Sequence, residues 1–237
     1  MVIGFIESIG DKTANIFIST YNIILFSTLS ILNIFNPVNY TKTLKTTFVL
    51  QLYRTTIAII PRFSIFSFFF GSVLVSVLII LASKYNLHLE IGSFVINFII
   101  NTFATVFSAL FVLIKSNILY KKPSVYSNTT PYLLSSVLST MTLSLYFTFL
   151  VLISSFIPLM FFIHIDLHSY KQLIFDSIEL LDILTLFTKS ILYGLIITIV
   201  PIYHKAKSST LLHIILTTII SIFTIEVLSL ILRLYIN

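Results

Sequence analysis

Residues 63–83 read FSIFSFFFGSVLVSVLIILAS, a run without a single charged side chain. The run is entered through Pro61-Arg62 and left at Lys84-Tyr85-Asn86, so polar residues close it at both ends. A helix rises about 1.5 Å per residue, and a run of this length therefore crosses hydrocarbon about 30 Å thick. We predict a transmembrane helix here, and this helix decides the class of fold.

Four further apolar runs are bounded in the same way by charge, proline or asparagine. They cover residues 91–114, 132–163, 180–203 and 211–232. The run 132–163 is longer than one crossing requires and has Pro158 near its far end, so we expect it to tilt or kink. The sequence predicts an all-α polytopic membrane protein with about five transmembrane helices, folded as a single domain over residues 1–237.

The composition excludes a soluble globular protein. The chain has 237 residues, of which 57% are hydrophobic and 9% charged, whereas an ordinary globular domain carries roughly 25% charged residues. Much of the apolar surface must therefore face lipid. The absence of cysteine excludes disulfides and cysteine-based metal sites. The net charge of +6 indicates anionic lipid head groups as partners, and nothing supports binding of nucleic acid.

Two segments before the first run are predicted to be helices near the membrane surface. Residues 12–35 are long and apolar enough for a sixth span, but their polar residues lie within about 80° of one another at about 100° per residue: Asn15, Ser19, Asn22, Ser30 and Asn33. This stripe favours an interfacial helix over residues 1–36, with a sixth span as the alternative. Residues 40–60 form a basic helix near the cytoplasmic surface, before Pro61 turns the chain inward.

The distribution of Lys and Arg orients the five spans. With the N-terminus inside, ten basic residues face the cytoplasm: Lys12, Lys42, Lys45, Arg54, Arg62, Lys115, Lys121, Lys122, Lys205 and Lys207. Only Lys84, Lys171 and Arg233 face the other side, where Glu90, Asp166, Asp176 and Glu179 also gather. This bias predicts a cytoplasmic N-terminus and a C-terminus on the outer side of the membrane.

Polar side chains of three spans are predicted to lie at one depth. Lys189 is 14 residues from Tyr203, Glu226 is 15 residues from Leu211, and Asn101 is 14 residues from Lys115. By helical rise, each lies about 21 to 23 Å from the cytoplasmic face, and Asn97 lies one turn from Asn101. A Lys189–Glu226 ion pair is sterically feasible. The layer is either the wall of a cavity filled with water or head groups, or a buried structural pair that joins the helices.

Motifs for chemistry within the chain are sparse. There is no Gly-rich phosphate loop, so any ATP is expected in a partner subunit and the chain itself is predicted to have no cofactor and no enzymatic activity. The nearest approach to a metal pattern is His164, Asp166 and His168 at the outer end of a span. A membrane-embedded lipid-modifying enzyme using these residues is an alternative; polar residues meeting water is the simpler interpretation.

The order of these features resembles the MlaE family of permeases. The residues that carry the resemblance are Gln51-Leu52-Tyr53 in the basic helix, Gly71 in the first span, and Lys189-Ser190-Ile191-Leu192-Tyr193-Gly194 in the fourth. The family's intramembrane Lys corresponds to Lys189, and its acidic residue in the last span, usually Asp, corresponds to Glu226. The resemblance implies a permease subunit of an ABC transporter that moves phospholipid between inner and outer membranes.

The resemblance also implies partners and a cavity. The partners are a cytoplasmic ABC ATPase, an MCE-domain protein on the outer side, and a second permease copy or a paralogue. Lys189, Glu226, Asn101, Asn97 and Gly71 are the expected cavity residues. Where the family has Arg-Glu-Leu-Gly-Pro, this chain reads Asn101-Thr102-Phe103-Ala104-Thr105, and the acidic coupling helix that should follow is missing before Pro123. A second hypothesis is therefore a structural half-subunit that works beside a complete permease.

Overall fold

The computed structural model describes residues 18, 21–36, 40–85, 99–116, 129–206 and 209–236. Across these ranges every regular element is a helix. The elements are α2 (Lys42–Leu52), the π-helical turn η2 (Tyr53–Ile57), α3 (Ile60–Tyr85), the π-helical turn η4 (Ile99–Phe103), α5 (Ala104–Lys115), α6 (Thr130–Ile163), α7 (Leu167–Ser177), α8 (Leu180–Ala206) and α9 (Leu211–Ile236). The predicted all-α class is confirmed.

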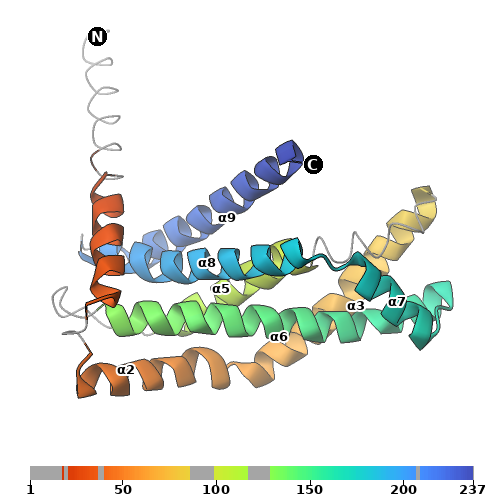
Figure 1. Ribbon diagram of the computed structural model, residues 1–237, viewed down its shortest axis with the longest axis horizontal. Helices are drawn as coiled ribbons and strands as arrows, with labels where there is room; N and C mark the ends of the chain where they lie inside the picture. Colours follow the sequence, from red (N-terminus) through yellow and green to blue (C-terminus); the bar gives the residue numbers. More distant parts are fainter. Residues whose placement is uncertain are drawn as a thin grey trace, which may run out of the picture.

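The longest helix, α6, is the centre of the bundle. α2, α3, α5 and α8 all pack against it, and α9 packs mainly on α8. Figure 1 shows α2 running beside α6 and α3 crossing α6 obliquely, while α8 runs along the side of α6 opposite to α2. The start of α2, the end of α5, the start of α6 and the turn from α8 to α9 all lie at the same end of the molecule.

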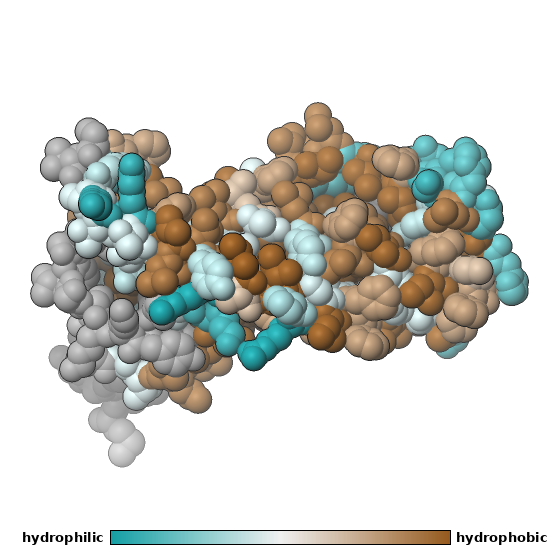
Figure 2. Space-filling model, turned by 90° about the horizontal axis from the view of Figure 1, so that it is seen from below, coloured by the Kyte–Doolittle hydropathy of each residue, from teal (hydrophilic) through white to brown (hydrophobic). Residues whose placement is uncertain are grey.

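Four helical segments are long and apolar enough to cross a membrane: Lys42–Leu81, Thr130–Ile163, Leu180–Lys205 and Leu211–Leu232. The predicted run 63–83 lies within α3 and overlaps the first segment as far as Leu81, and the runs 132–163, 180–203 and 211–232 lie within the other three. The predicted run 91–114 is described from Ile99 onward, as the shorter apolar helix Ile99–Lys115. Figure 2 shows hydrophobic side chains over most of one face of the molecule, and the chain is a polytopic membrane protein.

The predicted basic helix 40–60 corresponds to α2 and η2. Thr41 caps α2 by accepting a hydrogen bond from the backbone N–H of Leu44. Helical geometry is interrupted at Ala58 and Ile59, and α3 leaves the line of α2 beyond this turn (Figure 1). Pro61 is the second residue of α3, where its missing N–H costs no helical hydrogen bond.

Part of the predicted interfacial segment is the helix Tyr21–Ile34. This helix runs across the end of the bundle, not along it (Figure 1). Ser30 is buried, while Asn22 and Asn33 of the same predicted polar stripe are exposed, and Phe26 contacts Tyr203 of α8 with ring centroids 6.2 Å apart. Its direction suits a helix in the membrane surface, which stays a prediction.

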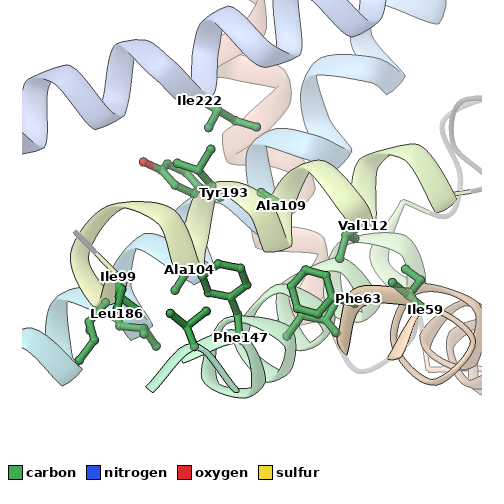
Figure 3. Packing of buried hydrophobic residues seen from close by; sticks show 14 of the residues in the cluster. Ile59, Phe63, Ile99, Ala104, Ala109, Val112, Phe147, Leu186, Tyr193 and Ile222 are labelled. Atoms are coloured by element: carbon green, nitrogen blue, oxygen red, sulfur yellow. The ribbon is translucent and has the colours of Figure 1, made fainter. Parts of the chain in front are cut away.

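Aromatic rings and two glycines set how closely the helices approach. Phe70 lies 4.8 Å from Phe107 between ring centroids, within a group of phenylalanines shared by α3, α5 and α6. Figure 3 shows part of this core, with Phe63 and Phe147 among the buried side chains. A Cβ atom on Gly194 of α8 would stand 2.6 Å from the Cα atom of Val137 in α6. Gly194 therefore permits the close crossing of α6 and α8.

Candidate functional site

The predicted ion pair between α8 and α9 is present. The Lys189 Nζ atom lies 2.8 Å from the Glu226 Oε1 atom, and the two residues are only 5% and 4% exposed. Ionised groups withdrawn from water to this extent are stable only when they are paired and hydrogen-bonded. The pair therefore joins α8 to α9 in the buried interior of the bundle.

Two more residues complete the coordination of this pair. The Tyr193 hydroxyl donates a hydrogen bond to the second carboxylate oxygen of Glu226, and the Lys189 ammonium group also donates to the backbone carbonyl oxygen of Asn101. Tyr193 is fully buried. Both oxygens of Glu226 thus have a donor, and the ion pair is tied to the beginning of the α5 segment as well as to α8 and α9.

The backbone acceptor of Lys189 belongs to the turn η4. Asn101 is the middle residue of this π-helical turn. A carbonyl oxygen carries two lone pairs, so the Asn101 carbonyl can accept from Lys189 of α8 in addition to a donor within its own helix.

A second carboxylate, Asp182, enters the same cluster and was missed by the sequence analysis. The Asn101 Nδ2 atom lies 2.8 Å from the Asp182 Oδ1 atom, and the backbone N–H of Glu179 donates to the other oxygen at 3.2 Å. Asp182 is 4% exposed. It therefore caps the start of α8 and extends the buried polar cluster to Asp182, Asn101, Lys189, Tyr193 and Glu226.

A signal for the missed residues was present in the spacing along α8. Asp182 precedes Lys189 by seven residues and Tyr193 follows it by four. These intervals are about two turns and one turn, so the three side chains share one helix face. That face also carries Leu186 and Ile197, which are buried.

The other predicted site residues are placed differently. A Cβ atom on Gly71 would stand 2.3 Å from the Ser154 Oγ atom of α6, so Gly71 lies at the contact between α3 and α6. Asn97 lies outside the described residues. The layer predicted from depth thus includes Lys189, Glu226 and Asn101 in direct contact.

His164 and Asp166 act at helix ends. His164 adopts a left-handed backbone conformation with φ of 57° and ends α6, and Asp166 caps α7 by accepting from the backbone N–H of His168 at 3.2 Å. A hydrogen bond from Ser169, with smaller contributions from backbone groups, lowers the pKa of Asp166. Within the ranges that the structure describes, no three His, Cys, Asp or Glu side chains are placed to share a metal ion.

An apolar groove lies along α3 and has Phe103 of η4 in its wall. The groove has a volume of about 360 Å³ and is lined by Phe70, Val73, Leu74, Val77, Leu78 and Phe103. Phe103 belongs to the same five-residue turn as Asn101. With only apolar side chains in its wall, the groove offers hydrocarbon a surface and offers no hydrogen bond to a polar ligand.

Comparison with known proteins relates part of the chain to one protein family. Residues 123–231 match the family model of the permease MlaE. The matched range contains α6, α7, α8 and most of α9, and so includes Asp182, Lys189, Tyr193 and Glu226. No curated protein matches the chain. Residues 123–231, somewhat less than half of the chain, are thus similar to the MlaE permease family.

Proposed function

We propose that the chain is the permease subunit of an ABC-type transporter that moves phospholipid between the inner and outer membranes. The family match carries the proposal, because the matched range contains four of the five residues of the buried polar cluster. MlaE permeases are transporter components, so ATP hydrolysis is assigned to a separate cytoplasmic ATPase.

The apolar groove supports a substrate with hydrocarbon chains. It opens on α3, where Val73 and Val77 are 63% and 50% exposed, and its inner wall includes Phe103. An acyl chain in this groove would exchange lipid contacts for protein contacts of similar polarity. Entry and exit would then cost little free energy, which suits a transported lipid.

The buried polar cluster is proposed to meet the phosphate of the head group. Lys189 is a compact cation that suits a phosphate oxygen. Because Lys189 already holds Glu226 at 2.8 Å, phosphate would have to compete with this carboxylate. Such an exchange of one anion for another never leaves the ammonium group unpaired in an apolar environment.

The orientation of the chain and its partners follow from the charge distribution. Lys42, Lys115 and Lys205 belong to the start of α2 and the ends of α5 and α8, which lie together, while Lys84 and Lys171 belong to the far ends of α3 and to α7 (Figure 1). The positive-inside rule then favours an inner-membrane protein with a cytoplasmic N-terminus and a periplasmic C-terminus. The ATPase would bind on the basic side, and an MCE-domain protein on the opposite, more acidic side.

A second candidate function is a structural half of a heterodimeric permease. The sequence favours it at one point, since the family's acidic coupling helix has no counterpart between Lys115 and Pro123. In this version a paralogue would contact the ATPase, and this chain would supply only one wall of the lipid cavity.

The test is affinity purification in mild detergent, with mass spectrometry of proteins and lipids. We expect an ABC ATPase, an MCE-domain protein and stoichiometric phospholipid to co-purify. A second permease sequence in the same preparation would support the heterodimer, and its absence a homodimer. Recovery of the chain alone, without ATPase or lipid, would contradict both versions.

A further inference from the structure

The short helix α7 joins the outer ends of α6 and α8. It is linked to them by residues 164–166 and 178–179 only. The last turn of α6 exposes Phe161 and Phe162, and the first turn of α8 exposes Leu180 and Leu181. Since both neighbours present apolar side chains outward next to these short links, α7 lies where the hydrocarbon of the membrane ends.

The inner face of α7 is fixed to α6, which sets its rotation about its own axis. The Tyr170 hydroxyl is 2.7 Å from the Ser155 Oγ atom and also donates to the backbone carbonyl of Leu152. The Tyr170 ring lies 5.3 Å from that of Phe156. Tyr170 and Ile174 are each 8% exposed, one turn apart on this inner face.

With its inner face against α6, α7 has two exposed flanks, one mainly apolar and the other polar. One flank carries Leu167, Lys171 and Phe175 at intervals of four residues, and Leu167 and Phe175 are 53% and 76% exposed. The other flank carries the exposed polar side chains His168, Gln172 and Asp176 at the same intervals. This division into an apolar and a polar flank is typical of a helix that lies in a membrane surface.

We propose that α7 lies in the outer head-group layer of the membrane, with Leu167 and Phe175 inserted among the acyl chains. In Figure 1, α7 runs across the direction of α3, as a helix in the membrane surface must run relative to a span. Lys171 stands between the two apolar residues, and its long aliphatic stem lets the ammonium group reach lipid phosphate while the stem stays in hydrocarbon. The occupant of the apolar flank is thus a lipid surface.

Continuity with the neighbouring spans favours lipid over a protein partner. The apolar flank follows the exposed apolar end of α6 and precedes the exposed apolar start of α8. Exposed apolar side chains therefore continue along the chain from α6 through α7 to α8. The polar flank with His168, Gln172 and Asp176 then remains the side that faces water. A periplasmic partner would meet this polar flank, not Phe175.

The chain contains no tryptophan, so one introduced tryptophan reports its own surroundings. The full-length protein is reconstituted alone into phosphatidylcholine–phosphatidylglycerol vesicles as Phe175→Trp, with Gln172→Trp as the matched control on the polar flank. We expect lipids brominated near the top of the acyl chain to quench most of the emission of Phe175→Trp and little of that of Gln172→Trp. Iodide on both sides of the vesicle should quench the two variants in the opposite order.

The proposal is overturned if Phe175→Trp is quenched by iodide as strongly as Gln172→Trp and is insensitive to brominated lipid. That result would mean that the apolar flank binds a protein partner and not lipid, because no partner is present in these vesicles. Both variants must elute and melt as the parent does. If Phe175→Trp fails this check, Leu167→Trp on the same flank replaces it, with the same expected and contrary results.

Discussion

The charged residues Lys189 and Glu226 depend on each other, because neither has access to water. Removing one partner leaves an uncompensated charge in apolar surroundings, whereas removing both leaves none. We expect Lys189→Met and Glu226→Gln to lower the free energy of unfolding by about 3 to 5 kcal/mol each, and the double variant Lys189→Met/Glu226→Met to recover most of this loss. Thermal melting in detergent measures the effect, with Lys171→Met on the exposed helix α7 as the control.

The same double variant separates the two interpretations of the polar layer. If Lys189 meets the phosphate of the lipid, the double variant regains stability without regaining lipid transport in proteoliposomes. Transport that returns together with stability would show that the pair only joins α8 to α9. The proposed role of Lys189 as a head-group contact would then be wrong.

The two glycines at helix crossings differ in what surrounds them. At Gly194 the nearest atom to a new Cβ is the Cα atom of Val137, at 2.6 Å, whereas at Gly71 it is the Ser154 Oγ atom. A side chain can move more cheaply than backbone, so Gly194→Ala should cost about 1 to 3 kcal/mol and more than Gly71→Ala. Melting of both variants checks the order, and adding Ser154→Ala should recover stability only in the Gly71→Ala background.

At the scale of one element, α7 is held by the hydroxyl of Tyr170. Tyr170→Phe removes its hydrogen bonds to α6 and should lower stability by about 1 to 2 kcal/mol. Burial raises the pKa of Tyr170 above its usual value of 10.0, against a smaller opposing effect of Ser155. The folded protein thus holds this proton more tightly than the unfolded chain, so its contribution is complete below pH 10 and declines as the pH rises further.

The pH dependence gives a second measurement on the same variant. Wild type should lose stability more steeply than Tyr170→Phe when melting is followed upward from about pH 9. Tyr53→Phe, which alters an exposed tyrosine, should keep the wild-type slope. Equal slopes for wild type and Tyr170→Phe would show that Tyr170 does not titrate differently in the folded protein.

The sequence predicted the transmembrane helices and the approximate depth of their charged residues, but it did not predict the irregular turns. Long apolar runs predicted α3, α6, α8 and α9, because a helix that crosses the hydrocarbon of a membrane must be about 20 residues long and apolar. Counting residues from the ends then placed Lys189 and Glu226 at matching depth. The acceptor on Asn101 is a backbone carbonyl in the turn η4, and side-chain identity carries no information about such a group.

The remaining gaps have separate physical causes. Asp182 was not predicted because it lies in the first turn of a span, where a charged side chain is expected to meet water, although its spacing from Lys189 places it on the same helix face. Helix α7 escaped notice because five of its eleven residues are polar or charged on outer faces, which hides its inner apolar face from a search for long runs.

At the scale of the whole molecule, the apolar groove is expected to decide how much lipid the protein retains. Val73→Phe/Val77→Phe places two larger side chains in the groove and should reduce the phospholipid that co-purifies per chain. Ile65→Phe/Ile80→Phe enlarges two exposed residues of the same helix outside the groove lining. Lipid extraction and mass spectrometry compare the pairs, and equal lipid content would contradict the assignment of the groove to acyl chains.

The hydroxyl groups along α6 have a consequence for movement within the bundle. Thr140, Ser144, Ser154 and Ser155 each donate to a backbone carbonyl of α6 itself. Ser190 of α8 does the same toward Leu186, in addition to its contact with Ser144. When α8 and α6 shift relative to one another, each hydroxyl keeps the bond to its own helix. Sliding therefore breaks the bonds between the helices, from Thr140 to the Ser190 carbonyl and from Ser190 to Ser144, but leaves none of these hydroxyl donors unsatisfied in hydrocarbon.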